Sequence, residues 1–403
     1  MRSFKFLHAA DLHLDSPLRG LSAYEGAPVE EIRGATRRAL AKLVDVALQE
    51  EVDFVLIAGD LFDGDQADYS GALYLRAQLG RLSVPVYLIS GNHDAESVLT
   101  KSLEHPENVW SFPVNEAGSI RHPDLPVLVH GQGFAERAVL NNLVTSYPEA
   151  EGENFNIGLL HTGLSGRAGH DPYAPCTLED LNAKEYQYWA LGHVHTREVV
   201  QEDPPVIFPG NIQGRHARET GEKGCYLIEV SEDLEVQEKK FQVLDQVRWE
   251  QVEVSLEGVA DGAAFRAKVR DKMEGLPAKA GGRLLVLRLI LSGRTEWHGE
   301  LHRDADKWEA ECRALAGEIP GGQIWLEKVK RRTQPLRSLA DLREQDDLSR
   351  RIVEGLENFD PVELDELCPR LKDLLPDGES LETLFPGEDL HREVEALVVE
   401  AIS

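Results

Sequence analysis

Five short apolar runs in the first half of this chain each end at a small cluster of Asp, His or Asn residues. The runs alternate with longer polar or helix-like stretches, which is typical of a β-sheet covered by helices. The carboxyl ends of strands in such sheets form the crevice where ligands bind, so we expect the five clusters to meet at one site. They are Asp11-Leu12-His13, Gly59-Asp60-Leu61-Phe62-Asp63, Gly91-Asn92-His93-Asp94, His161 and Gly192-His193-Val194-His195.

The pattern of apolar residues predicts three segments. In residues 1–245 we expect an α/β domain. Its predicted strands are 4–10, 54–58, 84–90, 127–130, 157–161, 188–191, 206–208 and 225–230, and its predicted helices are 29–49 and 71–82. Residues 246–332 read as a small β-α-β-α-β domain with strands 247–256, 283–291 and 323–329, helices 263–273 and 304–315, and turns at Gly281-Gly282 and Gly321-Gly322. Residues 333–403 show only helical stripes, which either pack on the chain's own core or bind a partner.

Charge and length limit the classes of function. The chain has 403 residues and a formal net charge of -28, so it does not coat nucleic acid by bulk electrostatics. An acidic chain can still act on DNA if metal ions or a basic partner subunit neutralise it locally. No apolar run is long enough to cross a membrane, the short N-terminal apolar stretch does not suit a signal peptide, and the four cysteines lie far apart. We therefore expect a cytoplasmic protein with reduced thiols and no membrane association.

The residue types in the five clusters suit divalent metals. Carboxylates and imidazoles bind Mn²⁺, Fe²⁺ or Zn²⁺, and no thiolate is offered. In Asp11-x-His13 and His193-x-His195, the alternation of an extended chain puts both side chains on the same side. Each cluster alone is a weak signal, because a D-x-H pair or a Gly-Asp turn is common in other settings. Together, in order and each at a predicted strand end, they predict a dinuclear metal site.

These motifs resemble those of the calcineurin-like metallophosphoesterase superfamily. The wider strings "FLHAADLHLDSPLRGL", "GHDPYAPCTLEDL", "WALGHVH" and "PGNIQGRHARETGEKGC" resemble the SbcD-type DNA-repair exonucleases, and within them the bacterial YhaO branch. The similarity covers roughly residues 4–245 and continues more loosely through the small domain. It implies two packed mixed β-sheets flanked by helices, followed by a capping domain that helps select DNA and by helices that dock on a partner.

The resemblance also implies a role for each site residue. Asp11, His13, Asp60 and His195 hold one metal, and Asp60, Asn92, His161 and His193 hold the other, with Asp60 bridging. His93 is the histidine that binds no metal and stabilises the transition state or protonates the leaving oxygen, and Asp63 orients it. The two ions are Mn²⁺ in the family, with Fe²⁺, Zn²⁺ and Mg²⁺ as alternatives, and a hydroxide that bridges them attacks phosphorus.

Several other residues have two interpretations, one functional and one purely structural. Asn211, Arg215, His216 and Arg218 lie on one Gly-rich segment, where they either hold substrate phosphates or only shape turns. The basic run of residues 328–332 either contacts DNA, with Trp325 available for stacking, or is a solvated strand end. His170 and Asp171 lie on a loop that either contacts substrate or is a plain surface loop. His8 lies inside the first predicted strand and is expected to be a hydrogen-bonded core residue.

We therefore expect a metal-dependent DNA phosphodiesterase, an SbcD-like exo- or endonuclease of DNA repair. Its expected partners are DNA and an SbcC-type coiled-coil ATPase subunit, and a homodimer is an alternative assembly. A hydrolase of the same fold that acts on a small nucleotide or another small phosphodiester is the first rival. A non-catalytic interaction subunit with a structural metal site is the second.

Overall fold

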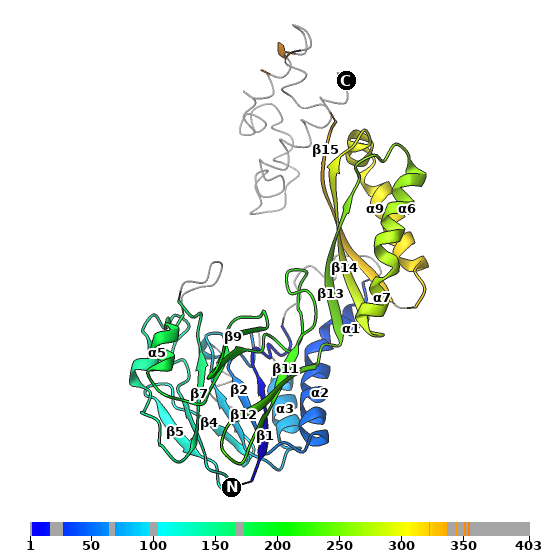
Figure 1. The fold of residues 1–403 in the computed structure, drawn as a ribbon. Helices are drawn as coiled ribbons and strands as arrows, with labels where there is room; N and C mark the ends of the chain where they lie inside the picture. The colour runs from blue at the N-terminus through cyan, green and yellow to red at the C-terminus, as the bar shows by residue number, and fades with distance from the viewer. Residues whose placement is uncertain are drawn as a thin grey trace. The chain divides into compact units, whose positions relative to one another are not determined.

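The computed structural model describes residues 2–16, 27–63, 69–96, 104–165, 173–321 and 323–336, with single residues at 344, 350, 351 and 354. The chain divides into two compact units, Met1–Glu250 and Gln251–Ser403, and each is described by itself (Figure 1). The predicted helical stripes of residues 333–403, the loop residues His170 and Asp171, and Cys368 lie outside the described residues. Within the described part of the chain, no helix is long and apolar enough to cross a membrane.

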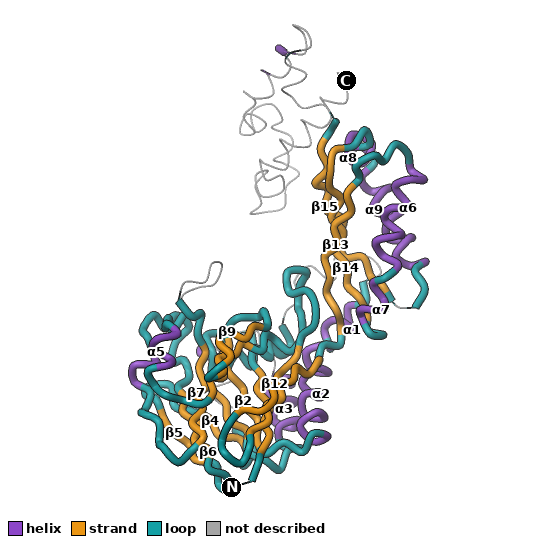
Figure 2. The backbone as a smooth tube through the Cα atoms, in the orientation of Figure 1, coloured by secondary structure: helices purple, strands orange, loops and turns teal. Residues whose placement is uncertain are grey.

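Two six-stranded mixed sheets form the first unit (Figure 2). The first sheet has the order β12 (Val236–Val243), β11 (Gly224–Val230), β1 (Phe4–Ala9), β2 (Phe54–Ala58), β3 (Val86–Ile89) and β4 (Val109–Ser111). The second has the order β5 (Gly118–Arg121), β6 (Val127–Gly131), β7 (Phe155–His161), β8 (Tyr188–Gly192), β10 (Pro205–Phe208) and β9 (Glu198–Glu202). The prediction of two packed mixed sheets flanked by helices is confirmed.

The two sheets pack face to face through aromatic side chains. Phe6 of β1 stacks on Phe54 of β2 with ring centroids 4.8 Å apart, and it meets Tyr188 of β8 edge-on at 5.2 Å. All three side chains are buried in one apolar cluster that draws on both sheets. Removing an aromatic ring of this kind from a core costs about 3–5 kcal/mol of folding free energy. This layer therefore holds the strand ends of both sheets in a fixed relation.

Helices cover the outer faces of both sheets. α2 (Ala35–Gln49) and α3 (Tyr69–Leu79) share an apolar cluster with the first sheet, while α5 (Leu178–Asn182) packs against the second. The helix predicted over 29–49 is divided at Gly34 into α1 (Val29–Arg33) and α2. The strands β4, β5, β9 and β12 were not predicted: the first three are short, and none of the four has a buried apolar run.

A three-stranded sheet with helices makes up the described part of the second unit, and its first strand begins in the last residues of the first unit. The strand order is β13 (Val247–Ser255), β14 (Leu284–Arg294) and β15 (Ile324–Gln334), with β14 and β15 parallel. The helices are α6 (Gly262–Glu274), α7 (Leu276–Ala280), α8 (His298–Arg303) and α9 (Ala305–Glu318). Alternate leucines of β14, from Leu285 to Leu291, lie in one core cluster with Phe265 and Trp308 from these helices. The β-α-β-α-β pattern expected for this region is present, with α7 and α8 as additional short helices.

Candidate metal centre

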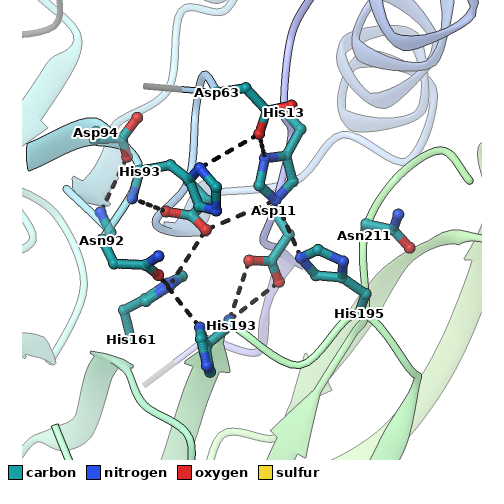
Figure 3. A network of polar contacts seen from close by, with 12 residues as sticks. Asp11, His13, Asp63, Asn92, His93, Asp94, His161, His193, His195 and Asn211 are labelled. Atoms are coloured by element: carbon teal, nitrogen blue, oxygen red, sulfur yellow. Dashed lines mark hydrogen bonds and ion pairs between the residues drawn. The ribbon is translucent and has the colours of Figure 1, made fainter. Parts of the chain in front are cut away.

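The carboxyl ends of the central strands of both sheets lie at the same edge of the first unit. β1, β2 and β3 are parallel neighbours in the first sheet, and β7, β8 and β10 are parallel neighbours in the second. Chain segments beyond β1 and β2 stay paired, because Asp11 N donates to Gly59 O and His13 N to Asp60 O, both at 3.0 Å. The five clusters therefore converge, as the sequence predicts (Figure 3).

Several residues at this edge have strained backbones. Asp11, His13, Asp60 and His193 have φ angles of 51°, 43°, 53° and 100°, which lie in a region that non-glycine residues rarely occupy. Such conformations cost about 1–3 kcal/mol each and cluster at functional sites. Each of these turns aims a carboxylate or imidazole into the site.

The glycines of the motifs have two different roles. Gly59 has a φ of 90° and supplies a turn that other residues resist. Gly91 and Gly192 are needed instead for close approach: a Cβ on Gly91 would lie 2.2 Å from Asp60 Oδ1, and one on Gly192 would lie 1.9 Å from Ala58 O. Gly91 therefore lets the loops after β2 and β3 approach each other, and Gly192 lets the end of β8 approach β2 of the other sheet.

Asp11, His13 and His195 make up the first ligand group. Their ligand atoms all lie within 4.8 Å of one another. His13 Nε2 and His195 Nε2 face each other at 3.1 Å. The Asp11 carboxylate is fixed by the backbone N–H of His193, with contacts of 3.1 and 3.2 Å to its two oxygens.

Three charged side chains, those of Asp63, Arg215 and Glu219, bind one another and orient the histidines of the first ligand group. His13 Nδ1 donates to Asp63 Oδ1 at 2.5 Å, and His195 Nδ1 donates to Glu219 Oε1 at 2.7 Å. Arg215 joins these two carboxylates, with Nη1 3.1 Å from Asp63 and Nη2 3.1 Å from Glu219. Hydrogen bonds at Nδ1 fix the tautomer and direct each Nε2 lone pair into the site.

The pKa values of these side chains follow from their hydrogen bonds and ion pairs. Burial opposes ionisation of Asp63 and Glu219, but their bonds to His13 and His195 and the charge of Arg215 hold both pKa values well below the usual range. Burial also opposes charge on His195, yet the Glu219 hydrogen bond and the Asp11 carboxylate outweigh it and raise the pKa of this imidazole. Burial and Arg215 lower the pKa of His13.

The second ligand group comprises Asn92, His161 and His193. Asn92 Oδ1 lies 2.9 Å from His161 Nε2 and 3.3 Å from His193 Nδ1. His161 Nδ1 donates to the backbone carbonyl of Ala58 at 2.8 Å, so its Nε2 presents a lone pair to the site. Main chain from the other sheet, rather than a charged side chain, therefore orients this imidazole.

Asp60 lies between the two ligand groups. Its Oδ2 is 3.7 Å from His13 Nε2 and 3.5 Å from His161 Nε2, while Oδ1 accepts the backbone N–H of His93 at 3.0 Å. Burial opposes its charge, but the neighbouring histidines His161, His13 and His93 lower the pKa of Asp60 to about 2. A carboxylate in this position has one oxygen in reach of both groups.

The donor chemistry fits two cations. His13 Nε2 and His195 Nε2 are lone pairs that face each other, because both Nδ1 atoms donate to carboxylates. Asn92 Oδ1 and His161 Nε2 are likewise two acceptors at 2.9 Å. Facing lone pairs repel unless a positive charge lies between them. Oxygen and imidazole ligands without thiolate suit Mn²⁺, Fe²⁺ and Zn²⁺.

His93 stands apart from both ligand groups. Its side chain is 35% exposed, and its Nδ1 lies 3.6 Å from Asp63 Oδ1. Among the described residues, no hydrogen bond involves His93 Nε2, so this atom is available to a substrate. Asp63 makes its shorter contacts with His13, Ser16 and Arg215, so it orients His13 at least as directly as the predicted target His93.

Two of the four predicted substrate contacts lie inside the site and two do not. Arg215 is largely buried between its two carboxylates, with its side chain 13% exposed, and Asn211 is buried with Nδ2 donating to Glu219 at 2.9 Å. Asn211 Oδ1 has no hydrogen-bond partner among the described residues. His216 and Arg218 lie on the exposed surface of the same loop, with His216 3.6 Å from Glu219. Their contact with substrate stays a prediction.

Two supporting residues had no role in the sequence-based prediction of the site. Glu219 was not singled out, although a Glu four residues after Arg215 was the available signal. Asp94 belongs to the third cluster but was assigned no role, and its buried carboxylate accepts backbone N–H groups of Leu61, Phe62 and Gly91 at 2.9–3.1 Å. Burial and the charge of Asp60 raise the pKa of Asp94 to about 7. It ties the loop after β2 to the loop after β3.

His8 is a core residue, as predicted. It is fully buried in β1, with Nδ1 2.9 Å from the Tyr188 hydroxyl and Nε2 3.2 Å from Leu191 O. Burial lowers its pKa to about 3, so the ring is neutral. It contributes no ligand to the site.

Comparisons with known proteins match both units. Residues 4–197 match the family model of the calcineurin-like phosphoesterases, and residues 249–334 match that of the middle domain of metallophosphoesterase YhaO. The chain is 38% identical over 301 residues to the uncharacterized metallophosphoesterase YhaO of Bacillus subtilis (strain 168), a match that covers 72% of each chain.

Two more distant similarities were found. The chain is 26% identical over 253 residues to the DNA double-strand break repair protein Mre11 of Sulfurisphaera tokodaii, which covers 58% of this chain and 62% of the relative. A solved structure of a dimetal phosphatase from Danio rerio is 15% identical and covers 57% of this chain and 93% of its own, with a TM-score of 0.35.

Proposed function

Because this chain belongs to the calcineurin-like metallophosphoesterases, hydrolases with a dinuclear metal site, and carries the middle domain of YhaO, we propose that it is a DNA phosphodiesterase that requires two metals. We propose an SbcD-like nuclease that acts in DNA repair. The observation that carries the proposal is the position of Asp60 between two groups of ligand atoms, with the half-exposed His93 beside them.

The residues divide the work of hydrolysis. Asp11, His13 and His195 would hold one cation, Asn92, His161 and His193 would hold the other, and Asp60 lies within reach of both groups. Two such cations supply Lewis-acid stabilisation of the phosphoryl oxygens and activate a water for in-line attack. Asp63, Arg215 and Glu219 hold the two imidazoles of the first group in the ligating tautomer. His93 Nε2, which faces no partner among the described residues, donates a proton to the leaving oxygen.

Arg215 serves this reaction as a supporting residue rather than as a phosphate ligand. Its guanidinium already binds the carboxylates of Asp63 and Glu219. If Arg215 moved to a substrate phosphate, the buried charge of Glu219 and the partly buried charge of Asp63 would lose their partner. The segment that carries Asn211 and Arg215 therefore contributes to the metal site through its hydrogen bonds. The exposed Arg218 and His216 are the residues of that segment that are open to a substrate phosphate.

DNA as substrate is supported by the relative that is named for DNA double-strand break repair. The net charge of -28 makes a basic partner part of the proposal, and an SbcC-type coiled-coil ATPase would meet that need. Residues 333–403 are the proposed docking segment for it. Mn²⁺ is the proposed ion, and a homodimer is an alternative assembly.

The test is a hydrolysis assay with two kinds of substrate. Metal-free protein is given Mn²⁺, then end-labelled single- and double-stranded DNA or bis-p-nitrophenyl phosphate, with and without a candidate ATPase partner. Cleavage of both substrates supports the proposal. Turnover of the small diester alone, under every condition, would favour the rival enzyme that acts on small phosphodiesters. No turnover of either substrate, with two metals bound, would favour the non-catalytic subunit.

A further inference from the structure

A β-bulge in the second unit changes which face of the sheet its cations occupy. In the pairing of β14 with β15, Leu287 lies opposite Leu326 but Arg288 lies opposite Lys328, so Glu327 is an extra residue. Before the bulge, Leu326 packs in the leucine core, and after it Val329 does so. Without the bulge, strand alternation would turn Lys328 and the cations two and four residues beyond it into that core.

The bulge instead gathers cations on the face opposite the leucines. Arg288, Lys328, Lys330 and Arg332 lie on this face, which we call the cationic face. Lys328 and Arg332 are exposed, and Lys330 is partly exposed. Burial and the charges of Arg288, Arg332 and Lys328 lower the pKa of Lys330, so the four side chains are within electrostatic reach of one another.

Three of these four charges are uncompensated. Arg288 pairs with Glu327 through contacts of 2.8 and 2.6 Å. Among the described residues, Lys328, Lys330 and Arg332 form no ion pair, and the nearby charge of Glu327 only partly offsets the cations that lower the pKa of Lys330. Uncompensated like charges on one strand repel, so they cost stability in isolation. In a chain of net charge -28, a cluster of cations that costs stability indicates a functional role.

We propose that the cationic face binds the phosphate backbone of a nucleic acid. Alternate residues of a strand are spaced by about 6.6 Å, so Lys328, Lys330 and Arg332 present a row of charges to an extended polyanion. Contacts of this kind position nucleic acid without reading its sequence. The choice of nucleic acid over another polyanion rests on the proposed DNA phosphodiesterase function. The face itself rests on the geometry of β14 and β15.

A competing explanation is protection of an edge. β15 is an edge strand of its sheet, and lysines on edge strands prevent pairing with other chains. That role predicts aggregation when the charges are removed, with no change in affinity for DNA. The two explanations therefore differ in a measurable quantity.

The experiment measures DNA binding in EDTA, where no cleavage occurs. Fluorescence anisotropy with a labelled duplex follows affinity against salt concentration for the full chain and for K328Q/K330Q/R332Q. We expect weaker binding and a log–log salt slope that is smaller by about 2.7, since each lost phosphate contact removes about 0.9. The variant K328R/K330R/R332K keeps the charges and should keep the slope.

The matched control removes three charges from the other side of the same unit. Lys272, Lys279 and Arg313 lie on α6, α7 and α9, which pack against the leucines, so K272Q/K279Q/R313Q should leave the slope almost unchanged. An unchanged slope in K328Q/K330Q/R332Q, or equal losses in both variants, would overturn the proposal. So would a wild-type chain that does not bind DNA.

The outcome is separable from that of the proposed function. Hydrolysis of bis-p-nitrophenyl phosphate should be the same in wild type and both variants, because none of the substituted residues belongs to the metal centre. If the chain binds DNA through this face but cleaves none, the proposed nuclease function is refuted and the binding role of the cationic face stands. If the chain cleaves DNA but the salt slope of K328Q/K330Q/R332Q is unchanged, the nuclease function stands and the role of the cationic face is refuted.

Discussion

The two ligand groups of the metal centre are held in place by different means. His13 and His195 of the first group are oriented by the carboxylates of Asp63 and Glu219, which Arg215 joins. His161 of the second group is oriented by the backbone carbonyl of Ala58. Single substitutions can therefore weaken the support of the first group, whereas the support of the second is part of the sheet and stays as long as the fold does.

The largest effect is expected where the two groups meet. Asp60→Asn removes the charge that both groups share, so we expect both metals to be lost at micromolar concentrations and hydrolysis to fall below detection. Isothermal titration with Mn²⁺ and the bis-p-nitrophenyl phosphate assay measure this. Full turnover with two bound metals would show that Asp60 does not bridge. Circular dichroism checks that the variant is folded.

The next effect separates chemistry from metal binding. His93→Gln should lower kcat by about 10²–10⁴-fold, because a general acid contributes that much, while both metals still bind. The reason is that His93 lies outside both ligand groups, with its imidazole Nδ1 3.6 Å from Asp63 Oδ1. Loss of a metal in this variant would make His93 a ligand and refute its assigned role.

A smaller effect tests directly whether the two ligand groups are supported independently. Glu219→Gln should weaken metal binding at the first group by about 10–100-fold and leave the second unchanged, as expected for a partner that orients a ligating histidine. The matched control is Glu222→Gln, because Glu222 is exposed and its contact with Arg197 is 3.9 Å long. Equal weakening of both metals would mean that the two groups are not supported independently.

The smallest effect is a shift with pH. A metal at the first group must displace the proton of His195, whose pKa is raised by Glu219 and Asp11 against the effect of burial. Affinity is therefore full above this pKa and falls about tenfold per pH unit below it. Glu219→Gln lowers the pKa, so the fall should begin at lower pH than in wild type. Titrations in several buffers measure it, and a fall at higher pH would contradict the account.

Much of this site could be predicted because its signals are local. Asp11, Asp60 and Asn92 directly follow buried strands, so one apolar run both identifies the strand and places the ligand. Glu219 could not be found in this way, because its bond to His195 joins two loops that only the fold brings together. The need for a glycine at position 192 could not be predicted from the sequence either, because the clash that a side chain would make there is with Ala58 on the other sheet.

The limits of the fold prediction have the same origin. Strands β4 and β9 are short edge strands with few buried side chains, so they lack the apolar run that identifies a strand. In β15, simple alternation misplaces every cation after Glu327, because the bulge depends on the pairing with β14. The basic run was visible in the sequence, but the face it occupies was not.

The most direct test of the central claim is to locate the metals. Anomalous diffraction from crystals soaked in Mn²⁺ should show two peaks roughly 3.5–4 Å apart, one among Asp11, His13 and His195 and one among Asn92, His161 and His193, with Asp60 in contact with both. Crystals of Glu219→Gln at limiting Mn²⁺ should lose the first peak before the second. A single peak in wild type, or peaks away from Asp60, would contradict a two-metal centre.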